Sequence, residues 1–223
     1  MGSEGTLGVI TEVTLRLLPA QPASSVVVAT FASVQAASDA VLGVTRRIRP
    51  AMLEFMDSVA INAVEDNFRM GLDREAAAMV LAGSDERGRA GAEDATLMAN
   101  VFAEHAAKEV FTTDDPQEGE AFVAARRFCI PAVEGKGSLL LEDVGVPLPA
   151  LGKLVTGIAR IAAERELMIS VIAHAGDGNT HPLIVYDPTD AAMMQRAHLA
   201  FGKSWSWPSA WVARSPASTA SAG

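Results

Sequence analysis

The dipeptide Asp177-Gly178 constrains the fold more than any other feature of the sequence. It separates two runs rich in β-forming residues, 168–174 and 180–186. Asp-Gly is favoured in two-residue hairpin loops because both loop positions need positive φ. The sequence therefore predicts an antiparallel hairpin whose loop consists of these two residues.

The rest of the sequence alternates irregularly between strand-like and helix-like patterns. Further strands are expected at residues 9–17, 26–31, 76–82, 109–113 and 138–146. Helices are expected at residues 34–49, 57–70, 90–107, 117–128, 150–166 and 189–203. This order, together with the tight hairpin, favours an α+β fold with a largely antiparallel sheet.

Composition narrows the class of protein. Hydrophobic residues make up 49% of the 223 residues and charged residues 20%, which is typical of a soluble globular protein. A run of about 18 uncharged apolar residues, as a membrane span needs, does not occur. The net charge of −9 disfavours nucleic acid as a partner. A single cysteine, Cys129, and the lack of a secretory signal predict a cytoplasmic location.

The predicted hairpin brings two histidines together. With a two-residue loop, His174 faces His181, and directly opposed residues have Cβ atoms about 4.5–5.5 Å apart on the same side of the sheet. Two such imidazoles can share a divalent metal or form a proton-handling pair. The alternative is that both are ordinary sheet residues. His105 and His198 fall in helical segments and are interpreted as structural or solvated.

Three segments resemble the FAD-linked oxidases related to D-lactate dehydrogenase and the glycolate oxidase D subunit, and they occur along this chain in the same order as in that family. Residues 174–181 (HAGDGNTH) resemble the family signature HxGDGNxH. Residues 2–11 (GSEGTLGVIT) look like the last flavin-contacting loop of its FAD domain. Residues 124–127 (AARR) followed by 142–147 (EDVGVP) resemble its substrate-side arginine and the next strand.

The resemblance implies a domain organisation. Residues 1–20 would end a FAD-binding domain, and residues 21–203 would form a ferredoxin-like cap domain that binds the substrate. Residues 204–223 would be a disordered or out-of-frame tail.

The resemblance also implies roles for particular residues. His174 and His181 would bind a divalent metal, zinc or manganese, or orient the substrate. Arg126 would pair with the substrate carboxylate through a bidentate contact. The alternative for Arg126 is a solvated charge at a helix end, and the adjacent Arg127 competes for the role. The flavin of FAD would meet four residues of the opening loop: Gly2, Ser3, Gly5 and Thr6.

Two acids follow the linker in a Leu-Glu-Phe-Met-Asp run that the family also tends to show. We interpret Glu54 and Asp57 as acids at a solvated helix start, where negative charge is favourable.

The C-terminal segment departs from the family pattern. All three tryptophans, Trp205, Trp207 and Trp211, fall within seven residues, and a run of Ala, Ser and Pro follows. Back-translation from Trp205, read one base earlier, permits MELAIGLGGAITGEHGVG, which contains the GEHGxG motif of the family. This predicts a single-base loss near Ser204 and an out-of-frame tail. The alternative is a genuine disordered tail.

The expected reaction is the oxidation of a 2-hydroxy acid, of the lactate or glycolate type, to the 2-oxo acid. The cofactor would be FAD, and the partners would be the substrate and other oxidase subunits. One alternative is a catalytically inactive remnant, or a subunit that needs a separate flavin-bearing chain. Another is an unrelated metal-dependent hydrolase, disfavoured because no carboxylate lies at helical ligand spacing beside either histidine.

Overall fold

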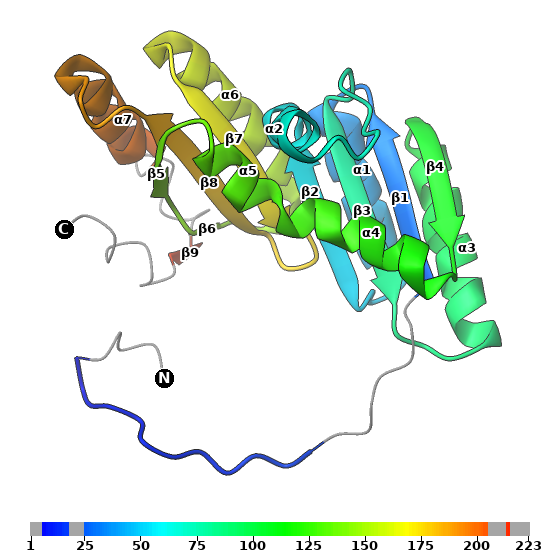
Figure 1. Cartoon of the computed structure of the whole chain (residues 1–223). Helices are drawn as coiled ribbons and strands as arrows, with labels where there is room; N and C mark the ends of the chain where they lie inside the picture. The colour runs from blue at the N-terminus through cyan, green and yellow to red at the C-terminus, as the bar shows by residue number, and fades with distance from the viewer. Residues whose placement is uncertain (1–5, 18–24, 205–212, 215–223) are drawn as a thin grey trace.

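A single antiparallel sheet organises the chain, and the computed structural model describes residues 6–17, 25–204 and 213–214. The sheet has nine strands in the order β4-β1-β3-β2-β7-β8-β6-β9, with β5 also paired to β8 (Figure 1). The strands are β1 Ser25–Phe31, β2 Met52–Asp57, β3 Ala78–Ser84, β4 Ala107–Thr113, β5 Ser138–Leu141, β6 Val144–Gly145, β7 Met168–His174, β8 Asn179–Tyr186 and β9 Ala213–Arg214. Every strand pair is antiparallel. The predicted α+β class with a largely antiparallel sheet is confirmed.

Helices cover both faces of the sheet. They are α1 Val34–Thr45, α2 Ser58–Phe68, α3 Arg89–Glu104, α4 Pro116–Arg127, α5 Cys129–Glu134, α6 Leu151–Arg165 and α7 Ala191–Ser204, with a short 3-10 turn at Leu148–Ala150. Apolar residues of α1, α3, α6 and α7 pack on one face, and those of α2, α4 and α5 on the other. Figure 1 shows α4 and α5 crossing in front of the sheet. The central strands β1 and β3 are therefore buried along almost their whole length.

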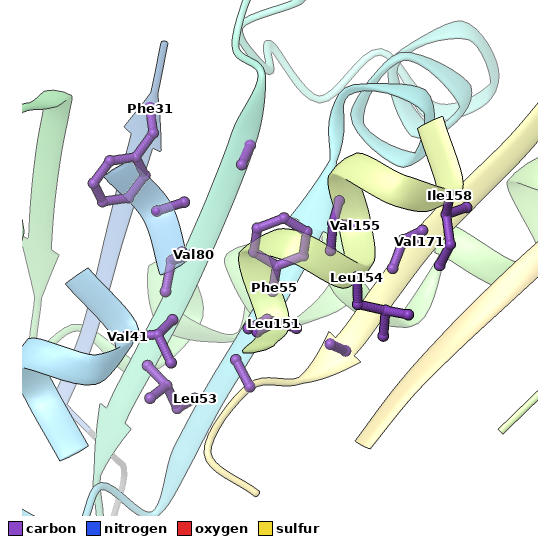
Figure 2. Packing of buried hydrophobic residues seen from close by; sticks show 14 of the residues in the cluster. Phe31, Val41, Leu53, Phe55, Val80, Leu151, Leu154, Val155, Ile158 and Val171 are labelled. Atoms are coloured by element: carbon purple, nitrogen blue, oxygen red, sulfur yellow. The ribbon is translucent and has the colours of Figure 1, made fainter. Parts of the chain in front are cut away.

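The larger core lies between the sheet and the first group of helices. Phe31 of β1 and Phe55 of β2 are fully buried there. Figure 2 shows Phe55 beside Leu151 and Val155 of α6, which belong to the same buried cluster. Packing of this kind stabilises the middle of the sheet, where β2 and β7 are neighbours.

Side-chain caps start several helices where the sequence predicted them. Ser33 accepts a hydrogen bond from the Ala36 N–H at α1, and Asp115 accepts from the N–H groups of Gln117 and Glu118 at α4. Such caps satisfy N–H groups that the first turn leaves without partners. Among the described residues no helix combines the length and apolar character that crossing a bilayer requires.

The predicted strand at residues 9–17 is wrong. The structure has no regular element there, although the alternation of apolar and polar residues is present. The large apolar side chains of this stretch are exposed: Leu7, Val9, Ile10, Val13, Leu15 and Leu17. A strand needs a hydrogen-bonded neighbour, and in the described part of the chain none pairs with this segment.

Two other predictions need correction. Residues 52–57, where no strand was predicted, form the central strand β2, and the expected strand at 138–146 is split into β5 and β6. The interruption at Glu142 and Asp143 lets both halves pair with β8 in different stretches of its length. Of the predicted tail, Ala213–Arg214 pairs with Val144–Gly145, and the remainder after Ser204 lies outside the described residues.

Asp57 is buried, so its interpretation as a solvated acid is wrong, although it does start a helix. Its carboxylate accepts hydrogen bonds from the Ala60 N–H of α2 and from the Ser170 hydroxyl and Val171 N–H of β7. Burial raises the pKa of Asp57 to about 6 despite these donors, which favour the charged form. The carboxylate joins α2 to β7.

The burial of Asp57 predicts a pH effect on stability. The folded chain binds this proton more tightly than the unfolded chain, so the free energy of unfolding falls as the pH rises from about 4 to about 6. At about 1.4 kcal/mol for each pKa unit, the loss is about 3 kcal/mol. Denaturant titrations should therefore show that the free energy of unfolding of the wild type, relative to that of Asp57→Asn, falls between pH 4 and pH 7. A difference that stays constant over this range would contradict the prediction.

Candidate active site

The hairpin between β7 and β8 has a different register from the predicted one. His174 pairs with Asn179 and His181 pairs with Ile172, so the loop has four residues, Ala175 to Gly178. Only Gly178 has a positive φ, of 80°. Its N–H donates to the His174 carbonyl, which closes the turn. The prediction that Asp177 and Gly178 alone form the loop is wrong.

Contacts from a distant segment fix this loop. The Gly178 carbonyl accepts a hydrogen bond from the Val146 N–H, and the Thr180 hydroxyl donates to the Val144 carbonyl. A Cβ at Gly178 would lie 2.1 Å from the Val146 carbonyl oxygen. Glycine is needed here both for its φ and for this close approach.

The two histidines nevertheless lie on the same side of the sheet. The register differs from the predicted one by two residues, and an even slip leaves every side chain on its original face. The rings are diagonal neighbours with centroids 5.1 Å apart and planes at 87°. They lie on the face covered by α2, α4 and α5, since Ile172 and Leu183, two residues from each, pack in that cluster.

Each imidazole is held by a carboxylate. His174 Nδ1 lies 2.7 Å from Glu54 Oε1, and His181 Nδ1 lies 2.5 Å from Asp143 Oδ1. Because an ionised carboxylate can only accept, each Nδ1 is the donor, and in a neutral ring Nε2 then keeps its lone pair. The two Nε2 atoms are therefore the ring positions that neither carboxylate occupies.

Burial distinguishes the two rings. The side chain of His174 is 50% exposed and that of His181 is 17% exposed. Burial lowers the pKa of His181 against the carboxylate of Asp143, and the positive charge of Arg126, joined by that of His174 whenever His174 is protonated, acts in the same direction as burial. His181 is therefore held in its neutral form at neutral pH, as a ligand or a proton acceptor must be.

Arg126 also reaches this site, through Glu54. Its Nε lies 2.9 Å from Glu54 Oε2, and the two side chains are 12% and 15% exposed. The atoms are close enough for an ion pair but are not aligned as a hydrogen bond, and neither has another hydrogen-bond partner in the part of the chain that the structure describes. Both the solvated interpretation of Arg126 and that of Glu54 are wrong.

The remaining candidates lie elsewhere. Arg127 is 63% exposed and pairs with Glu120, so it points away from the histidines. His105 is half-buried against Gly43 at the end of α3, and His198 is exposed on α7, as predicted. Thr6 is exposed, and Gly2, Ser3 and Gly5 lie outside the described residues. The flavin-binding prediction for that loop therefore stays a prediction.

Sequence reasoning missed Glu54 and Asp143 as members of this cluster. A signal for Glu54 was present: in β2 it shares a face with Met52 and Met56, and a carboxylate on an otherwise apolar strand face needs a partner. Asp143 had no comparable local signal, because its contact with His181 depends on how β6 pairs with β8. The two carboxylates complete the cluster of His174, His181 and Arg126.

A hollow of ≈ 640 Å³ opens beside this cluster. Glu54 and His174 form part of its wall, together with Arg49, Met52, Leu148 and Asp177. A larger hollow of ≈ 700 Å³ lies between α3 and the ends of β1 and β4 and is lined by none of the clustered residues. The chemistry of the walls, and not size, therefore indicates the first hollow as the place for a ligand.

Comparisons with known proteins find relatives over most of the chain. The chain is 37% identical over 205 residues to glycolate oxidase subunit GlcD of Escherichia coli (strain K12), covering 91% of this chain and 41% of that protein. It is 32% identical to GlcD of Bacillus subtilis (strain 168), covering 91% of this chain and 44% of that protein. It is 30% identical to mitochondrial D-lactate dehydrogenase [cytochrome] of Arabidopsis thaliana, covering 88% and 35%. The chain thus spans about two fifths of the length of these relatives.

Solved structures show the same fold at low sequence identity. Alkyldihydroxyacetonephosphate synthase superposes with a TM-score of 0.66 at 14% identity, covering 92% of this chain and 43% of that chain. p-Cresol methylhydroxylase superposes with a TM-score of 0.61 at 14% identity, covering 84% and 43%. Residues 20–207 match the family described as FAD linked oxidases, C-terminal domain. The chain belongs to this family and carries its C-terminal domain.

Proposed function

We propose that this chain is the substrate-binding part of a flavin-dependent oxidoreductase that converts a 2-hydroxy acid, of the glycolate or lactate type, to the 2-oxo acid. The observation that carries the proposal is the cluster of His174, His181 and Arg126, in which Glu54 joins Arg126 to His174 and the two imidazole rings are neighbours. It combines a cation for a carboxylate with two imidazole nitrogens for a hydroxyl. A 2-hydroxy acid has both groups on neighbouring carbons.

The proposed roles follow from this geometry. The Arg126 guanidinium, at the edge of the cluster, would bind the substrate carboxylate, and its planar fork suits a bidentate contact. The Nε2 atoms of the two histidines would face the 2-hydroxyl, and in the absence of a metal ion that of His181 would accept the hydroxyl proton as the Cα–H bond breaks. FAD, when bound, supplies the acceptor for the hydride from Cα.

The two histidines fit a divalent metal, which we include in the proposal as zinc or manganese. Metal-ligating histidines usually donate their other ring N–H to a carboxylate, and His174 and His181 do so to Glu54 and Asp143. Within the described residues no group of three or more His, Cys, Asp or Glu side chains is placed to hold an ion. The substrate carboxylate and hydroxyl would therefore contribute ligands. A bound ion would lower the pKa of that hydroxyl.

Cysteine chemistry does not contribute. Cys129 is buried, and burial raises the pKa of its thiol to about 12, so it is not a nucleophile at neutral pH. A single cysteine in the whole sequence supports the proposed cytoplasmic location.

A second candidate is a subunit that acts only with a separate flavin-bearing chain, for which the exposed segment is the specific observation. Residues 7–17 expose six large apolar side chains. An exposed apolar surface of this kind is typical of a contact with another protein. Absorbance between 400 and 500 nm, which bound flavin gives, and dye reduction with glycolate or D-lactate distinguish the two candidates.

The histidine pair gives the proposed function its direct test. Titration calorimetry of the wild type with ZnCl2 should show one binding event, and His181→Ala should weaken it about 10-fold or more, since one of two protein ligands is lost. His198→Ala, which removes an exposed histidine of α7, should leave the affinity unchanged. Equal affinities of wild type and His181→Ala would exclude the metal from the proposal. If the His181→Ala chain, mixed with a flavin-bearing partner, still reduces the dye at the wild-type rate, the histidine pair is excluded from catalysis.

A further inference from the structure

We propose that Glu54 is a positioning residue that fixes both the tautomer of His174 and the place of Arg126. The inference deepens the proposed function and rests on it, since it concerns how the two substrate-holding groups keep their separation. Each oxygen of the carboxylate faces a different group: Oε1 lies 2.7 Å from His174 Nδ1, and Oε2 lies 2.9 Å from Arg126 Nε.

The backbone holds Glu54 in this place. In β2 it lies between Leu81 of β3 and His174 of β7, directly opposite each in the antiparallel register. Directly opposed side chains share a face, so the carboxylate and the imidazole meet without distortion of either strand. Arg126 comes from the last turn of α4, which crosses this face. One side chain in the interior of the sheet therefore joins a strand and a helix.

A purely stabilising role does not account for a carboxylate at this position. The neighbours of Glu54 on the same face of β2 are Met52 and Met56, and placing a carboxylate here costs desolvation that an apolar side chain avoids. Of the two groups that Glu54 contacts, His174 is half exposed and forms part of the wall of the 640 Å³ hollow. The carboxylate fixes groups that face a ligand space.

The tautomer is the distinctive consequence. A carboxylate on Nδ1 requires that this nitrogen carries the proton, so the lone pair of His174 lies on Nε2, on the far side of the ring. With Nε2 protonated instead, the ring would present a donor where a substrate hydroxyl or an ion needs an acceptor. Glu54 therefore selects the form of His174 that the proposed function uses.

The test combines two readouts on the whole metal-free chain. Long-range 1H–15N spectra at pH 8 should show the Nδ1–H tautomer for His174 in the wild type, and a loss of that preference in Glu54→Met, which fills the space without an acceptor. Glu54→Gln, whose amide oxygen can still accept a hydrogen bond, should keep the preference for the Nδ1–H tautomer. Titration with ZnCl2 should show about 10- to 100-fold weaker binding in Glu54→Met, as expected for a lost outer partner of a ligand. Glu120→Gln, which alters the exposed pair with Arg127, is the matched control and should change neither readout.

The outcomes separate this inference from the proposed function. An Nε2–H tautomer of His174 in the wild type, or the same tautomer in wild type and Glu54→Met, would overturn the role of Glu54. If Glu54→Met does not fold, the wild-type tautomer and the comparison with Glu54→Gln still decide the matter. Absence of zinc binding by a wild-type chain that shows the Nδ1–H tautomer would instead contradict the metal in the proposed function.

Discussion

Replacing Phe55 with alanine is expected to destabilise the chain by about 3 to 5 kcal/mol, the usual cost of removing a buried aromatic side chain. Phe55 has no exposed surface and lies in β2, in the middle of the sheet, against the cluster that includes Leu151 and Val155 (Figure 2). Whole domains are stable by only about 5 to 15 kcal/mol. This single change should therefore remove a large part of the free energy of unfolding, measured by urea titration.

The control for this prediction is a large apolar residue at the surface. Leu199 of α7 is 48% exposed, and Leu199→Ala should change the stability by no more than about 0.5 kcal/mol. Phe55→Leu should fall between the two, because most of the volume remains filled. Similar urea midpoints for Phe55→Ala and Leu199→Ala would show that β2 does not anchor the core.

The elements that the sequence predicted well are those with local signals. The helix expected at residues 34–49 is α1, Val34–Thr45, started by Ser33, and the helix expected at 117–128 is α4, started by Asp115. In both, the capping residue directly precedes the helix in the sequence, so the signal is local. The antiparallel hairpin was also correctly predicted from its two β-rich runs and the turn between them.

The elements that the sequence did not predict depend on distant contacts. The strand β2 has only six residues and continues directly into α2, so no turn marks its end. The hairpin register depends on the bond from Val146 to Gly178, between segments about thirty residues apart. Residues 9–17 have the alternation of a strand but no described neighbour to pair with. A periodic pattern predicts which side chains share a face of a strand, but it does not predict whether a partner strand lies beside it.

In the candidate site too, features with a local signal were predicted and features that depend on distant contacts were not. The prediction that His174 and His181 share one side of the sheet is confirmed, because the actual register differs from the predicted one by an even number of residues. The carboxylates that orient them were missed, since Glu54 comes from β2 and Asp143 from the break between β5 and β6. The roles of these residues, and of Arg126, stay predictions.

Arg126 and Arg127 are adjacent in the sequence but should respond very differently to replacement by methionine. Arg126→Met leaves the carboxylate of Glu54 largely buried without its cation, and breaking a buried pair from one side costs about 3 kcal/mol or more. Arg127→Met removes only an exposed pair with Glu120 and should cost less than about 1 kcal/mol. Urea titration of the two variants at pH 7 measures the difference directly.

Ligand binding separates a structural role of Arg126 from the proposed one. Oxalate has the carboxylate and the neighbouring oxygen of a 2-oxo acid and is inert, so its binding can be measured without turnover. If Arg126 binds the substrate carboxylate, Arg126→Met should weaken oxalate binding about 10-fold or more, because a hydrogen bond to a charged group contributes about 1.5 to 3 kcal/mol. Arg127→Met should bind oxalate like the wild type. A folded Arg126→Met chain that keeps the wild-type affinity would show that Arg126 serves only to neutralise Glu54, and the carboxylate of the substrate would need another cation.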